Sequence, residues 1–320
     1  MARRSTLAPL LRVVTTVVML AVLQPRLDIS RLVPLKRPAT LGWLLAAVAV
    51  SIAAACVSAV RWQRVLIALD RPTRLAGLIS HCFAGLFVGN FLPSTIGGDI
   101  VRVSRLSSAT GDSPTSFASV VLERLTGWIV LPLLTLSGLL LNPGLLRLGT
   151  ASRVAVAVAM TTVLLLGGIV LAAVSRPRPA GPLTDRIGWQ RFMGALHIGI
   201  DRFRSRPAAT IPVILTGFAY QLLVVLAAFL GARALGLPLS PSAALVFVPA
   251  VAMLQVVPIT MGGLGVREGA LVLFLSRSGL GASVEQAIAF GLLLYLMNIV
   301  VSLIGAPAFA AGTRPATARV

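Results

Sequence analysis

The sequence predicts an all-α, polytopic integral membrane protein with about six full spans and two re-entrant helical hairpins in an inverted repeat. Three observations predict this class. The 320 residues are 57% hydrophobic and only 12% charged, whereas soluble domains carry about 25% charged residues. Apolar runs long enough to cross a bilayer recur along the chain. Two shorter apolar stretches each end in a similar Pro/Gly-rich break.

Six apolar segments have the length of about 20 residues that a membrane-spanning helix needs. They lie at about 7–24, 40–60, 117–141, 152–174, 210–232 and 286–310. The first follows Arg3 and Arg4, as in a signal peptide, but no small-x-small cleavage site precedes Gln24, so an uncleaved helix is predicted. The largest polar stretch, Ser175 to Pro207, is predicted to be a loop. Residues 1–320 are therefore predicted to form a single transmembrane domain.

Two further apolar stretches are too short to span the bilayer. Leu78–Leu92 runs into Pro93, and Ser242–Val257 runs into Pro258. Each forms about 22 Å of helix, which is less than the hydrocarbon core of about 30 Å. Aligning the two prolines pairs PSTIGGDIVR with PITMGGLGVR, so that proline, threonine, both glycines, valine and arginine coincide. We interpret the match as an internal repeat, with chance similarity between two Pro/Gly-rich breaks as the alternative.

The distribution of basic residues predicts how the repeat is oriented. If each broken stretch crossed the membrane once, the basic loop at about 175–208, with its seven arginines, would lie outside, against the positive-inside rule. If each returns to its side of entry, seventeen basic residues lie inside and eight outside. The halves, about 40–174 and about 210–311, then form an inverted repeat in the cell membrane, with both termini cytoplasmic. In many transporters this arrangement places a binding site near the midplane.

The ionisable residues near the two breaks are the candidates for a substrate-binding polar core, because such groups at membrane depth usually face an interior or a cavity. The candidates are Asn90, Asp99, Arg102, Glu123, Arg124, Gln255, Arg267 and Glu268. Arg102 and Arg267 are expected to bind an anionic group such as a lipid phosphate. The carboxylates would hold the arginines or relay protons. The alternative is that Asp99–Arg102 and Glu123–Arg124 are structural ion pairs.

Other residues at the breaks are predicted to have structural roles. The prolines and glycines end helices and permit close backbone approach; they are Pro93, Gly97, Gly98, Pro258, Gly262 and Gly263. Asn90 and Gln255 are expected to cap the broken ends or contact a ligand. Gly85 and Gly89 are spaced for close helix packing. Arg105 is expected to extend to the inner surface.

Near the span ends, Trp62 is expected to be an interfacial anchor, as are Trp43 and Trp128. The isolated cysteines and histidines lack metal-ligand spacing, so neither a metal nor another cofactor is expected.

The motifs GNFLPSTIGGDIVRVSRL, ERLTGW and VPITMGGLGVREGALVLF resemble the transmembrane region of lysylphosphatidylglycerol synthases, and the likeness runs from about Leu41 to Gly312. Stand-alone proteins of this kind are often called flippase-like. The resemblance implies movement of lipid between leaflets. It supports a polar core made of Asp99, Arg102, Glu123, Arg124, Arg267 and Glu268. The soluble aminoacyl-transfer domain of the bifunctional enzymes has no counterpart in these residues, so that enzymatic activity is not expected. The resemblance does not identify the substrate.

These observations favour a flippase-like protein that translocates a phospholipid or a lipid-linked anionic substrate. The sequence shows no Gly-rich nucleotide-binding loop, so nucleotide hydrolysis is not expected to drive the movement. Two alternatives remain. One is an intramembrane enzyme acting on a lipid-linked substrate, which the scattered acidic residues do not favour. The other is a non-transporting membrane assembly partner. The expected partners are membrane lipids and a lipid-linked substrate. Nucleic acid is not expected despite the net charge of +19, and a homo-oligomer or a membrane partner protein is left open.

Overall fold

A computed structural model of the chain describes residues 38–91, 97–175, 188–256, 263–276 and 280–311. These residues form an all-helical bundle, and no strand occurs among them. Five of the described helices are long and apolar enough to cross a membrane. They are α3 (Pro38–Ala68), α6 (Ser113–Leu141), α7 (Thr150–Ser175), α9 (Pro207–Ala234) and α12 (Val284–Leu303). The predicted class is confirmed; the span predicted at about 7–24 lies outside the described residues.

Shorter helices complete the bundle. They are α4 (Leu75–Phe91), α5 (Gly97–Thr110), α8 (Trp189–Ser205), α10 (Pro241–Leu254), α11 (Val266–Leu271) and α13 (Gly305–Ala310). A 3-10 turn, Pro143–Arg147, follows α6, and a π-helical turn, Val272–Ser276, follows α11. The last predicted span is divided, because α12 ends at Leu303 and α13 begins again at Gly305.

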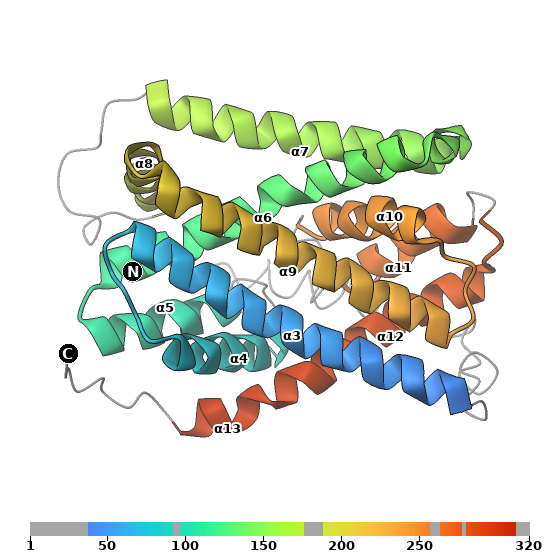
Figure 1. The fold of residues 1–320 in the computed structure, drawn as a ribbon, viewed down its shortest axis with the longest axis horizontal. Helices are drawn as coiled ribbons and strands as arrows, with labels where there is room; N and C mark the ends of the chain where they lie inside the picture. Colours follow the sequence, from blue (N-terminus) through green and yellow to red (C-terminus); the bar gives the residue numbers. More distant parts are fainter. Residues whose placement is uncertain (1–37, 92–96, 176–187, 257–262, 277–279, 312–320) are drawn as a thin grey trace, which may run out of the picture.

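The helices around the two breaks lie at opposite ends of the bundle (Figure 1). Helices α4 and α5 lie together at the end where α3 stops and α6 starts. Helices α10 and α11 lie toward the other end, where α9 stops and α12 starts. This placement agrees with the opposed entry that the charge distribution predicts. The re-entrant path and the number of full spans stay predictions.

Glycine brings α4 and α5 into close contact, as their spacing predicts. A Cβ atom on Gly98 would overlap the carbonyl oxygen of Gly85 and would lie 3.5 Å from the Cα atom of Gly89. A Cβ atom on Gly85 would lie 2.9 Å from the Cγ atom of Arg102. The glycine surface of α4 therefore lets α5 approach and leaves room for the stem of an arginine side chain.

The segment predicted as a basic loop contains a helix, α8. Its apolar residues recur at helical spacing, and Met193, Leu196 and Phe203 turn toward the protein. Gly199 of α8 packs directly against Leu122 of α6. Helix α8 is seen nearly end-on in Figure 1, while α7 and α9 run across the view, so α8 lies across the end of the bundle. The loop prediction was wrong here because it counted the charges of the segment and overlooked its periodicity.

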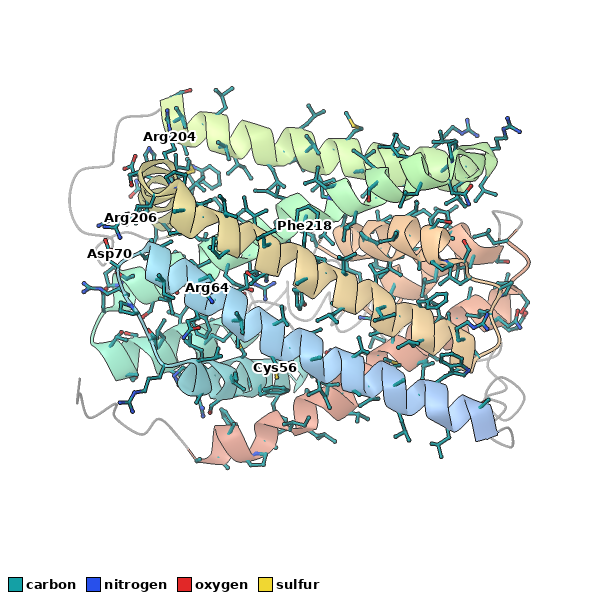
Figure 2. All side chains as sticks on the ribbon, viewed as in Figure 1. Cys56, Arg64, Asp70, Arg204, Arg206 and Phe218 are labelled. Carbon is teal, nitrogen blue, oxygen red and sulfur yellow. The ribbon has the colours of Figure 1, made fainter. Side chains whose placement is uncertain are left out.

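The end of the bundle near α8 is basic, and its ion pairs fasten the connections there. Arg202 and Arg206 both pair with Asp70, which lies beside Arg206 in Figure 2. Asp112 accepts a hydrogen bond from the Thr115 amide at 3.0 Å and so caps α6. Partial burial opposes ionisation of Asp112, but the Thr115 hydrogen bonds and the Arg71 guanidinium together hold its pKa below the ordinary value.

Candidate functional site

A buried carboxylate, Glu123 of α6, lies at the centre of the polar core. Its side chain is 1% exposed. It accepts hydrogen bonds from Arg61 Nε of α3 at 2.9 Å and from Arg102 Nη1 of α5 at 3.2 Å. Ser58 Oγ donates a third at 3.3 Å. One acidic residue thus joins three helices, and two arginines offset its charge where water does not reach.

A second carboxylate extends the network toward the surface. Asp99 lies 3.5 Å from Arg102 Nη1, so the predicted pair on one face of α5 is present. Asp99 also pairs with Arg124, whose side chain is 42% exposed. The neighbours Glu123 and Arg124 point to different partners, since adjacent residues on a helix do not share a face. The ion pairs therefore join α5 to α6, and the network runs from the buried carboxylate to a partly exposed arginine.

Aromatic rings cover both arginines that hold Glu123. The guanidinium carbon of Arg102 lies 4.3 Å from the ring centre of Trp62, and that of Arg61 lies 4.8 Å from the ring centre of Tyr220. Trp62 is 0% exposed, and its indole N–H donates to Ser119 Oγ at 2.9 Å. The expectation that Trp62 is an interfacial anchor was therefore wrong.

Arg61 and Trp62 are site residues that the sequence analysis missed. The predicted span stopped at about residue 60, which left Arg61 just outside it. In the structure α3 continues to Ala68, and Arg61 is 4% exposed. The apolar residues after Trp62 were the available signal, because Val65 and Leu66 continue the buried helical face.

Glycine also makes room for the Arg61 guanidinium. A Cβ atom on Gly127 of α6 would lie 2.6 Å from Arg61 Nη1. Gly217 of α9 lies on another side of the same side chain, where a Cβ atom would be 3.8 Å from Arg61 Cδ. The sequence therefore leaves space on two helices for one buried cation.

The arginines of the polar core have more N–H donors than the described residues provide acceptors for. Arg102 Nε, Arg102 Nη2 and Arg61 Nη1 are buried, and the described residues supply no hydrogen-bond partner for them. The ion pairs join three arginines to two carboxylates, so these five side chains together carry one net positive charge; they are Arg61, Arg102, Arg124, Asp99 and Glu123. Buried N–H groups without acceptors are costly. These three N–H groups are therefore the unsatisfied donors of the polar core.

The second break has a different chemistry. Arg267 Nη2 donates to Gln255 Oε1 at 3.1 Å, and its guanidinium lies 5.7 Å from the ring centre of Tyr295. Gln255 thus connects the end of α10 to α11. Gly263 has a φ of 74°, and a Cβ atom on it would lie 2.8 Å from Gln255 Oε1. Glycine is required there for both reasons.

Helix α12 connects the two breaks. Asn298 Nδ2 donates to Asn90 Oδ1 of α4 at 2.9 Å. Tyr295, three residues earlier, lies under Arg267. Residues three apart share a helix face, so both breaks contact the same face of α12 within one turn. Arg102 pairs with Glu123 and Asp99 near the first break, whereas Arg267 donates to Gln255 at the second.

The remaining break residues are partly described. Gly97 and Gly98 are buried at the start of α5. Pro93, Pro258 and Gly262 lie outside the described residues. Arg105 does not extend to the surface as expected. It is 6% exposed and donates to the carbonyl oxygens of Ala308 and Phe309, each at 2.9 Å, at the end of α13.

The fold and the site together define a multi-pass helical membrane protein with a buried, arginine-rich polar core next to interrupted helices. The family model described as the lysylphosphatidylglycerol synthase TM region matches residues 10–305, and the chain belongs to this family of membrane domains. The resemblance carried by the two break motifs is thereby confirmed. Neither a curated protein nor a solved structure matches the chain.

Proposed function

We infer that the protein moves a phospholipid or a lipid-linked substrate with an anionic headgroup between the two leaflets. One observation carries this inference: the buried arginines Arg61 and Arg102 have N–H groups without acceptors, and together with the partly exposed Arg124 they carry one positive charge more than Glu123 and Asp99. Each unsatisfied buried donor costs about 1–3 kcal/mol. An anionic oxygen that accepts these N–H groups would remove that cost.

A phosphate is the anion that suits this cluster. The planar guanidinium groups of arginine form paired hydrogen bonds with phosphate oxygens. Glu123 pairs with both arginines and Asp99 with Arg102, and three further N–H groups of the two arginines stay without an acceptor. Arg124, partly exposed and paired with Asp99, gives a headgroup a first contact on its route inward.

The interrupted helices support movement rather than static binding. Non-helical backbone at membrane depth is tolerated where it is buried in protein or lines a polar cavity. Here the two breaks come from opposite ends of the bundle and both reach α12 (Figure 1). Small shifts of α12 would open the polar core to one side or the other, which is the alternating access of transporters. Substrate passage needs no chemical step, and we propose a non-enzymatic role.

We further propose that the protein lies in the cell membrane with its basic end, near α8, facing the cytoplasm. The test uses single cysteines at two exposed positions, with Cys56 and Cys82 replaced by alanine. Ser108→Cys lies at the basic end and Leu146→Cys at the other end. An impermeant thiol reagent added outside cells is expected to label only position 146. Labelling of position 108 alone would reverse the proposed orientation.

The proposed activity is tested with purified protein in vesicles that contain a trace of fluorescent phospholipid. An impermeant quencher added outside reports how much labelled lipid reaches the outer leaflet. We expect the protein to accelerate movement of an anionic phospholipid more than that of a zwitterionic one. Both carry a phosphate, but the cationic amine of the zwitterionic headgroup cancels its charge, whereas the net negative charge of the anionic lipid balances the excess positive charge of the arginines. Equal rates, or rates equal to those of protein-free vesicles, would contradict the proposal. Chemically altered lipid recovered from the same vesicles would favour an intramembrane enzyme.

A further inference from the structure

A pair of asparagine side chains lies between the two breaks. Asn90 is near the end of α4, and Asn298 belongs to α12. Asn298 Nδ2 donates a hydrogen bond to Asn90 Oδ1 at 2.9 Å. Asn90 Nδ2 is buried, and no described residue accepts a hydrogen bond from it. The pair therefore carries hydrogen-bonding groups that the contact between the two amides does not use.

Asn298 belongs to the face of α12 that contacts both breaks. Gly291, Tyr295 and Asn298 share this face, because they are spaced by four and three residues. Gly291 packs against Glu268, a buried residue whose carboxyl group caps the start of α11. Tyr295 lies under the guanidinium group of Arg267. The same face then reaches α4 through Asn298.

The exposed surface of Asn298 is on the protein side of the helix. Leu296 and Val300, which are 56% and 50% exposed, lie on the opposite side of α12. Ser302, one turn beyond Asn298 on the same face, is buried, whereas Asn298 itself is exposed. An amide group exposed to hydrocarbon would be costly. On the protein side this surface is available to a polar ligand.

The chemistry of the pair selects the kind of ligand. Each asparagine amide has two N–H donors and one acceptor oxygen. The bond between the two side chains leaves over the N–H groups of Asn90 and the carbonyl oxygen of Asn298. A phosphate only accepts hydrogen bonds and an ammonium group only donates them, whereas a hydroxyl group does both. The uncharged pair is therefore complementary to hydroxyl groups.

The asparagine pair and the arginine cluster lie along the same helix. The stem of Arg102 packs against Gly85 of α4. Asn90 lies five residues beyond Gly85, which is about 7.5 Å of helix. A headgroup whose phosphate is held by the arginines can therefore present the hydroxyl groups of its esterified alcohol to the asparagines.

We propose that Asn90 and Asn298 form a subsite for headgroup hydroxyl groups, so that the protein prefers anionic lipids with a polyol headgroup, such as glycerol or a sugar, over equally charged lipids without hydroxyls. This inference rests on the proposed function, since it assigns the headgroup class for the same transport route. The arginines bind the charge, and the asparagines bind the uncharged remainder of the headgroup. A site built to bind a hydroxyl group discriminates against the analogue that lacks it, because its own polar groups are then left unpaired.

The test compares two lipids in the vesicle assay, phosphatidylglycerol and phosphatidylpropanol, each labelled on an acyl chain. They have the same charge and differ only in the two hydroxyl groups of the headgroup. The wild type is expected to move phosphatidylglycerol about 2- to 12-fold faster, which corresponds to one neutral hydrogen bond. Asn298→Leu is expected to move both lipids at the wild-type rate for phosphatidylpropanol. Gln190→Leu, which removes an exposed amide from α8, is the matched control and should keep the preference.

Each other outcome has a defined meaning. Equal acceleration of the two lipids by the wild type, or a preference that persists in Asn298→Leu, overturns the subsite but leaves the transport proposal intact. Loss of all movement in Asn298→Leu would give Asn298 a structural role and also overturns it. If the wild type moves neither lipid, the proposed function fails, and native mass spectrometry with an equal mixture of the two lipids decides the subsite separately. Preferential retention of phosphatidylglycerol by the wild type but not by Asn298→Leu supports it; equal retention of the two lipids by the wild type overturns it.

Discussion

Replacing Glu123 with alanine is expected to cause the largest loss of stability of any single carboxyl substitution in the protein. Glu123 is the shared partner of Arg61 and Arg102, and all three are buried. Removal of one member of a buried ion pair costs about 3–5 kcal/mol, because the remaining charge is left without compensation. Here two cations would be left together. Denaturant or thermal unfolding in detergent measures the effect.

Two control variants make this result specific. Glu285→Ala removes an exposed carboxyl group from the first turn of α12, where an acidic residue contributes at most about 1 kcal/mol, so the free energy of unfolding is expected to change by less than that. Glu123→Gln keeps one acceptor oxygen but replaces the other with an NH2 donor and removes the charge, so its loss should lie between those of the other variants. An unfolding curve for Glu123→Ala that matches Glu285→Ala would show that Glu123 does not hold the core together.

Replacing Arg102 with alanine is expected to slow lipid movement strongly while the protein stays folded. The reason is charge balance: without Arg102, the carboxylates of Glu123 and Asp99 still pair with Arg61 and Arg124. The variant loses the donors that have no partner in the protein. A charged hydrogen bond contributes about 1.5–3 kcal/mol, so the rate for an anionic lipid should fall about 10- to 150-fold.

Lysine should not restore the activity at position 102, because an ammonium group lacks the planar pair of donors and cannot stack on Trp62 in the same way. Arg64→Ala, which removes an exposed arginine from α3, is the matched control and should transport normally (Figure 2). Unchanged rates in both Arg102→Ala and Arg102→Lys, with Arg64→Ala also normal, would remove the cluster from the transport path.

The sequence predicts the helices whose apolar length or interruption is unusual. A span of about 20 apolar residues has few alternatives to a membrane helix, so α6, α7 and α9 follow the predicted segments closely. The breaks were visible because proline and paired glycines interrupt an apolar run. Helix α8 was missed because a charged segment between spans was interpreted through topology alone, although its apolar residues recur at helical spacing.

The contacts within the polar core could be predicted only in part. The pair Asp99–Arg102 follows from helical spacing within one element. The link from Arg61 to Glu123 joins residues on α3 and α6, and a single sequence contains no information on which helices adjoin.

Native mass spectrometry of the purified protein tests the central claim most directly, because the buried arginines are proposed to bind the anionic headgroup itself. The wild type and Arg64→Ala are expected to retain an anionic phospholipid through mild detergent extraction. Arg102→Ala is expected to lose it, with no gain of a zwitterionic lipid. The same anionic lipid bound equally to Arg102→Ala and to the wild type would contradict the account.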